Sequence, residues 1–135
     1  MASFDEVEKA GQAVADLIGA GIIPAGLEMM DKGMTAAVEE FVHAGYDLNA
    51  QAILLCESDG TPAEVEEEIG RMKAVLSNSG ATDLRVSESE AERLRFWSGR
   101  KNAFPASGRV SPDYYCIDGT IPRRRLGQML ARITE

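Results

Sequence analysis

Basic and aromatic side chains are concentrated between residues 95 and 125, in the stretch RFWSGRKNAFPASGRVSPDYYCIDGTIPRRR. These 31 residues contain seven Lys and Arg, the one Trp of the chain and two of its three Tyr. A guanidinium binds a carboxylate or phosphate through two parallel hydrogen bonds and stays charged. Because the stretch also shows little hydrophobic periodicity, it indicates a site for a small anion rather than a segment that only fills a core.

The charges are unevenly distributed along the chain, whose net charge is −8. Residues 1–70 hold 2 basic and 15 acidic side chains, whereas residues 71–135 hold 12 basic and 7 acidic ones. The acidic total argues against general nucleic-acid binding, which depends on neutralising phosphates. A basic region inside an acidic protein favours an anionic ligand or a charged partner surface. The alternative is that its arginines form ion pairs with the acidic half.

Length and composition set the general class of protein. A chain of 135 residues with 44% hydrophobic side chains fits one globular domain. It contains no apolar run of 18 residues, which predicts that no segment spans a membrane. The first residues, MASFDEVEK, lack the pattern of a signal peptide and favour a cytoplasmic location. Cys56 and Cys116 are therefore expected to be reduced thiols.

Helices and strands are predicted to alternate along the chain. The predicted strands span residues 22–30, 51–57, 84–87 and 114–117, and residues 105–112 are predicted to be a loop. Four predicted helices begin at the capping residues Ser3, Asp31, Thr61 and Ser89, and a fifth begins at Pro122. The helix that begins at Ser89 is predicted to reach residue 104. This order favours helices packed on an open sheet.

Two long and irregular motifs resemble a known family. One runs W-x-G-R-K-x-A-F-P and then S-P-D-Y-Y-C-x-D-G-T-I-P-R-R from Trp97 to Arg124, and the other is PAGLEMMD from Pro24 to Asp31. Both are similar to the first part of the C-terminal cap domain of FAD-linked 2-hydroxy-acid oxidases and dehydrogenases of the bacterial glycolate oxidase type. The resemblance implies that residues 1–135 form a partial cap domain. The flavin-binding domain is absent from this chain, and the family's metal-binding histidine motif would lie beyond it.

The resemblance also implies the fold, an α+β, ferredoxin-like, open and largely antiparallel sheet with helices packed on it. In the family a further strand follows the last helix. A sheet without that strand is expected to keep an unpaired edge, and such edges favour self-association. We therefore predict a homo-oligomer that forms through an exposed sheet edge.

There are three groups of candidate site residues, of which the first two follow from the family motifs. Arg100 lies in the W-x-x-R setting that clamps the substrate carboxylate, although it could also be a surface arginine in an ion pair. Cys116 occupies a position where hydroxyglutarate-oxidising relatives have a lysine, which implies a short monocarboxylate substrate such as glycolate or D-lactate. Arg123, Arg124 and Arg125 oppose the dipole at the start of the last helix, so they are candidates for anion or interdomain contacts.

The implied function is the substrate-side cap of an FAD-dependent oxidoreductase that converts a small 2-hydroxy acid to the 2-oxo acid. FAD would be bound chiefly by the absent domain, which is the expected partner, so we expect no cofactor in this chain and no activity from it alone. The alternative is a stand-alone ferredoxin-like module that binds a small carboxylate or mediates dimerisation.

Other titratable residues have simpler explanations. Glu28 and Asp31 are three residues apart and could act as acid and base, but Asp31 already serves as a predicted helix cap. His43, the one histidine, is better explained as a helix-capping or surface group. One His and two distant Cys do not have the spacing of metal ligands, and we predict no metal site.

Overall fold

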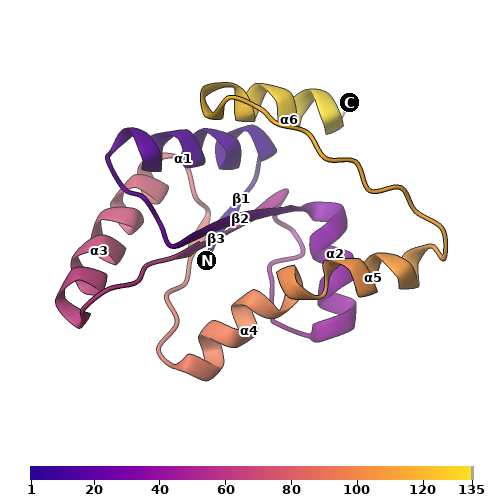
Figure 1. The fold of residues 1–135 in the computed structure, drawn as a ribbon, viewed down its shortest axis with the longest axis horizontal. Coiled ribbons are helices and arrows are strands. Elements are labelled where there is room, and N and C mark those ends of the chain that lie inside the picture. Colours follow the sequence, from indigo (N-terminus) through magenta and orange to yellow (C-terminus); the bar gives the residue numbers. More distant parts are fainter. Residues whose placement is uncertain (135) are drawn as a thin grey trace.

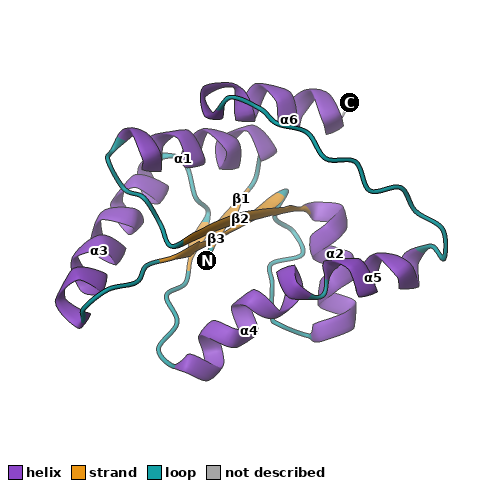
Figure 2. Cartoon of the chain, in the orientation of Figure 1, coloured by secondary structure: helices purple, strands orange, loops and turns teal. Residues whose placement is uncertain are grey.

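A four-stranded antiparallel sheet lies at the centre of the computed structural model, which describes residues 1–134 (Figures 1 and 2). Its strands are β1 (Ala2–Phe4), β2 (Gly26–Asp31), β3 (Ala52–Glu57) and β4 (Asp83–Leu84), in the spatial order β2-β3-β1-β4. All three neighbouring pairs are antiparallel. β2 and β4 are therefore the edge strands of the described sheet.

The connections confirm the predicted α+β, ferredoxin-like fold. The helices are α1 (Val7–Gly19), α2 (Lys32–Val42), α3 (Pro62–Asn78), α4 (Glu90–Lys101), α5 (Ala103–Val110) and α6 (Leu126–Thr134), with the 3₁₀ turn η1 (Arg123–Arg125) before α6. In a β-α-β-β-α-β unit one helix connects the first strand to the second, and the other connects the third strand to the fourth. Here α1 links β1 to β2 and α3 links β3 to β4, while α2 is inserted between β2 and β3.

Helices cover both faces of the sheet, so its central strands are buried on both faces (Figure 1). One core cluster joins α1 and α3 to side chains such as Phe4 and Leu54. The second cluster joins α2, α4 and α5 to Ile53 and Leu55, which point to the opposite face. Burial on both faces explains why residues 52–55 read as a continuous apolar run, and it confirms the strand predicted over residues 51–57.

Side-chain caps begin three of the helices where the sequence predicts them. Asp31 accepts a hydrogen bond from the backbone N–H of Met34 at 2.8 Å, which opens α2. Thr61 and Glu64 form the reciprocal capping box of α3. Ser89 accepts from the backbone N–H of Glu92 at 3.2 Å and opens α4. These caps satisfy N–H groups that have no partner within the helix.

The capping box predicted at Ser3 is wrong. Ser3 lies in β1 and is only 2% exposed, and α1 begins after Glu6 without a side-chain cap. The neighbouring Phe4 is fully buried in the core, and β1 is paired with strands on both sides. Burial between two strands therefore overrides the local capping pattern.

Two predicted strands have different bounds in the structure. The strand expected over residues 22–30 begins only at Gly26, because the chain is still turning at Gly21 and exposes 81% of Ile23. The strand expected over residues 84–87 is reduced to Asp83–Leu84. The length of β4 is limited by its pairing with β1, because Leu84 pairs with Ala2, the first residue of β1.

The region after α4 differs most from the prediction. Residues 105–112 were expected to form a loop, but most of them belong to α5, where Pro105 occupies the first turn and needs no N–H partner. The strand predicted over residues 114–117 does not form, and residues 111–122 cross the outside of the molecule from α5 to α6 (Figure 1). No strand lies beside this segment in the described part of the chain, so its backbone has no ladder to join.

The last helix packs on α1 rather than on the sheet (Figure 1). Contact between the backbones is close, because a Cβ atom at Gly11 would lie 2.6 Å from the Cα of Gly127. Leu126 and Leu130 are half-buried, but Met129 and Ile133 are 38% and 70% exposed. Both side chains are exposed because α6 covers one helix and has solvent on its remaining sides.

Candidate functional site

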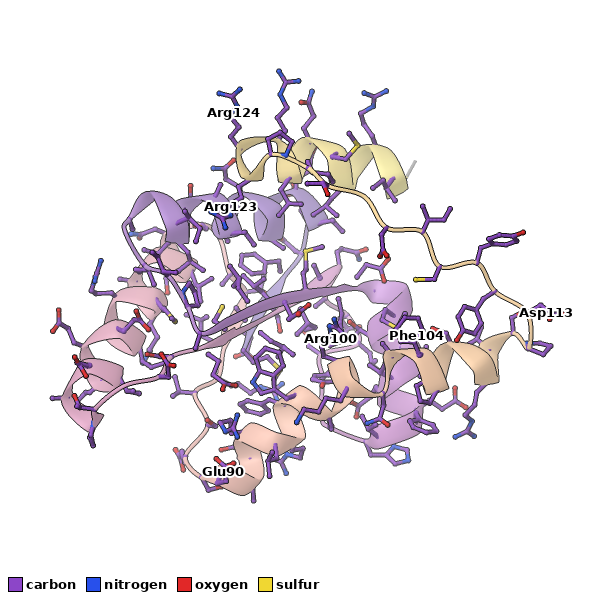
Figure 3. All side chains as sticks on the ribbon, in the orientation of Figure 1. Glu90, Arg100, Phe104, Asp113, Arg123 and Arg124 are labelled. Atoms are coloured by element: carbon purple, nitrogen blue, oxygen red, sulfur yellow. The ribbon has the colours of Figure 1, made fainter. Side chains whose placement is uncertain are left out.

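Arg100 lies in the last turn of α4 and reaches across to the edge strand β2 (Figure 3). Its Nε donates to Oε2 of Glu28 at 2.9 Å, and the two side chains are 43% and 41% exposed. The guanidinium is thus at the surface and not enclosed in the core. The pair joins the two motifs at residues 24–31 and 97–124, which are 72 positions apart at this contact.

The other arginines of α4 are bound differently. Arg93 is held by two carboxylates, because Nη1 contacts Glu57 while Nε and Nη2 contact Glu90. Arg95 uses Nη2 to bind Glu92 at 3.2 Å. Within the described residues, Arg100 makes its hydrogen bond through Nε alone, which leaves its Nη1–Nη2 edge open. That edge is one of those through which a guanidinium binds a carboxylate bidentately.

Two close contacts hold the turn of α4 that carries Arg100. A Cβ at Gly26 would lie 3.1 Å from the indole of Trp97, so the half-buried ring packs directly on β2. Tyr46 Oη donates to the carbonyl of Phe96 at 2.6 Å and accepts from the N–H of Gly99 at 2.9 Å. Both hydrogen bonds are buried. The backbone next to Arg100 is therefore fixed by a residue that the sequence did not single out.

Cys116 is exposed in the segment that follows α5, and no hydrogen bond or ion pair joins it to Arg100 among the described residues. Its neighbours Tyr115 and Ile117 are 97% and 86% exposed. Both cysteines are free. Burial raises the pKa of the Cys56 thiol to about 11, which keeps that side chain neutral.

Two of the three arginines before α6, Arg123 and Arg124, point in different directions. Arg123 and Glu28 line the same hollow, of about 350 Å³, between α1, β2 and the start of α6. Arg124 points outward from the turn (Figure 3). Among the described residues none of the three is within ion-pair distance of a carboxylate. Arg100 and Arg123 thus lie near the same edge strand, one paired with Glu28 and the other beside it.

The remaining predictions concern His43, metal binding and membrane-spanning segments, none of which involves the edge strand β2. His43 adopts the left-handed conformation that ends α2 and is exposed. In residues 1–134 there is no cluster of three or more His, Cys, Asp or Glu side chains that could hold a metal ion. In the same residues no helix is both long and apolar enough to cross a bilayer.

Glu28 is the site residue whose role the sequence did not reveal. The sequence offers Glu28 as a possible acid or base with Asp31, whereas in the structure Glu28 forms an ion pair with Arg100. The signal that could have indicated this was its position inside the motif PAGLEMMD. Which residue it contacts depends on α4 crossing β2, and that crossing is a property of the tertiary structure.

The fold is that of an α+β domain of the ferredoxin-like kind, with Arg100 and Arg123 near its edge strand β2. Comparison with known families is more specific: all of residues 1–135 match the family described as FAD linked oxidases, C-terminal domain. The chain belongs to this family.

The curated relatives are longer than this chain. It is 61% identical over 135 residues to the glycolate oxidase subunit GlcD of Escherichia coli (strain K12), covering 100% of this chain and 27% of that protein. The glycolate oxidase subunit GlcD of Bacillus subtilis (strain 168) is 30% identical over 135 residues, 29% of its length. The probable mitochondrial D-lactate dehydrogenase of Danio rerio is 27% identical over 130 residues, 26% of its length. The chain therefore spans about a quarter of each of these relatives.

Proposed function

We propose that this chain is the substrate-side part of an FAD-dependent oxidoreductase that oxidises a small 2-hydroxy acid to the 2-oxo acid. The observation that carries the proposal is Arg100, which is held through Nε by Glu28 while its Nη1–Nη2 edge is open. Family membership and the names of the three relatives, two glycolate oxidase subunits and a probable D-lactate dehydrogenase, support the class of substrate.

The role proposed for Arg100 is to bind and orient the substrate carboxylate. A 2-hydroxy acid presents this planar group one bond from the carbon that is oxidised, so fixing it also fixes the reacting carbon. When bound, FAD supplies the acceptor for the two electrons that leave this carbon. The chain has no glycine-rich phosphate loop, so we propose that a flavin-binding domain outside residues 1–135 holds FAD and is the partner of this surface.

Two further assignments refine this proposal. The uncharged Cys116, in place of the lysine of hydroxyglutarate-oxidising relatives, favours a substrate with one carboxylate. The arginines at 123–125 are proposed to contact the flavin-binding domain or another anion, and their lack of carboxylate partners among the described residues supports this. The cytoplasmic location stays a prediction.

A graft tests the role of Arg100. Residues 1–135 would replace the matching region of the Escherichia coli relative, and glycolate-dependent dye reduction would be measured in the complete enzyme. Loss of a charge-assisted bidentate contact is worth about 1.5–3 kcal/mol, so Arg100→Gln should raise KM on the order of 10- to 100-fold. Arg100→Lys should have an intermediate KM because it keeps the charge but not the fork.

Arg95→Gln is the matched control, since Arg95 lies on the same helix and pairs with Glu92 at the surface. It should change KM by less than about twofold. Equal KM values for Arg95→Gln and Arg100→Gln would contradict the proposal. A functional graft in which glycolate is not a substrate would reject the substrate class.

The alternative is a stand-alone module that binds a small carboxylate or mediates dimerisation, and its specific support is the outer edge of β2, which pairs with no other strand among residues 1–134. Calorimetric titration of the isolated chain with glycolate tests carboxylate binding. Light scattering tests association through the sheet edge: we predict twice the 14.6 kDa mass of one chain, and a monomer at high concentration would contradict this.

A further inference from the structure

A second cavity, of about 200 Å³, lies between α3 and α4 beside the carboxyl end of β3. Its walls are largely apolar, with Ile69 and Met72 contributed by α3 and Phe96 and Trp97 by α4. Neither Arg100 nor the arginines at 123–125 line it. It is therefore separate from the arginine-rich edge at β2.

The pairing of β3 explains the shape of this cavity. All six residues of β3 pair with β2 on one side, but on the other side β1 pairs only with Ala52–Leu54. Residues 55–57 consequently have a strand neighbour on one side only. Successive residues of an antiparallel strand direct their N–H and C=O groups to alternate sides. This stretch therefore offers backbone groups toward the cavity.

The opposite wall of the cavity continues the β4 side of the sheet. β1 pairs with β4 at Ala2 and Leu84, and Met1 and Arg85 then exchange two hydrogen bonds of 2.9 Å. Val86 and Ser87 follow along the cavity wall. Because β1 itself lies between β3 and β4, the space in line with it has the width of one strand.

The two faces of this space are mainly apolar, and the charged side chains that α3 and α4 add to the lining are Lys73 and Arg93. In β1, Ala2 and Phe4 belong to the core cluster under α1 and α3, whereas Met1 packs on the cluster under α2 and α4. An extended segment in line with β1 would place alternate side chains against α3 and against α4. A strand buried on both faces is an uninterrupted apolar run.

We propose that this cavity accepts an extended segment that continues β1 on its amino side in a longer polypeptide and is apolar on both faces. The segment completes the ladder between residues 55–57 of β3 and residues 86–87, and it covers the thiol of Cys56.

The test compares two extensions of equal length placed directly before Met1, Met-Thr-Val-Val and Met-Ser-Gly-Gly. The reaction of Cys56 with a small thiol reagent is followed by peptide mass spectrometry, and the exposed Cys116 in the same sample is the internal reference. Amide hydrogen exchange of residues 55–57 is the second measurement. Valine favours strands and fills the cavity, whereas glycine does neither.

The apolar extension is expected to slow modification of Cys56, and exchange of those amides in residues 55–57 that face the cavity, by about 10-fold or more, while Cys116 reacts at an unchanged rate. The Gly-Ser extension should leave Cys56 within about twofold of the original chain. Equal rates in all three proteins would overturn the proposal. Equal slowing by both extensions would also overturn it, because the effect would then be steric and not strand pairing.

Discussion

Replacing Tyr46 by Phe tests the contact that fixes the turn of α4 carrying Arg100. The substitution removes one oxygen and keeps the ring, so it leaves no large cavity in the core. It deletes the hydrogen bond to the carbonyl of Phe96 at 2.6 Å and the one from the N–H of Gly99 at 2.9 Å. Tyr46 is only 5% exposed, so water does not readily replace either bond.

The expected loss of stability is about 2 kcal/mol. Each buried hydrogen bond contributes about 1 kcal/mol net, and leaving both partners fully unsatisfied would raise the cost. We use the lower value because both backbone groups lie in α4, where helical partners are within reach. A change of 2 kcal/mol is roughly a 30-fold change in the folding equilibrium.

Urea unfolding measures this effect, with an unchanged m-value as the sign that only native-state stability has changed. Tyr115→Phe is the matched control, because Tyr115 is 97% exposed. It should change the free energy of unfolding by less than about 0.5 kcal/mol. If Tyr46→Phe were as mild as Tyr115→Phe, the two hydrogen bonds could not be what fixes this turn.

Two further predictions concern the same contact. Gly99→Ala should destabilise the protein by about 1–3 kcal/mol in urea unfolding, because its Cβ would lie 2.5 Å from the Tyr46 ring. The control Gly70→Ala has open space on the exposed side of α3 and should stabilise the protein by about 0.5–1 kcal/mol. A stabilising effect of Gly99→Ala would show that α4 is not held against Tyr46. Burial raises the pKa of Tyr46 above its usual value of 10.0, so the unfolded chain loses this proton first and stability falls as pH rises from about 10 through the folded pKa. Tyr46→Phe should lack this contribution, and unfolding curves of both proteins that fall in parallel above pH 10 would contradict the assignment.

Local sequence patterns predicted the elements that depend on local interactions. Asp31 and Thr61 cap their helices as expected, because a cap needs only a side-chain oxygen and an N–H three residues away. The apolar run likewise predicted the strand over residues 51–57, where β3 forms. The ferredoxin-like fold came from the family resemblance, and the strand order agrees with it.

The failures arose where a local pattern competed with pairing to distant segments. Ser3 has the spacing of a cap, yet burial of Phe4 between two strands makes its segment β1. Residues 114–117 have the composition of a strand but no neighbouring strand to pair with in the described chain. A strand is stabilised by its partners, so its composition alone does not decide whether it forms.

The sequence by itself determined that a basic, aromatic region follows an acidic half and that it carries the family motifs in which Arg100 lies. Only the tertiary structure decided what holds that arginine. Glu28 lies 72 positions from its contact on α4, and Tyr46 lies 50 and 53 positions from its two contacts there. They reach these contacts because the helix crosses β2 and the core beneath it. Side-chain direction at such crossings depends on packing between distant elements, and no local pattern encodes it.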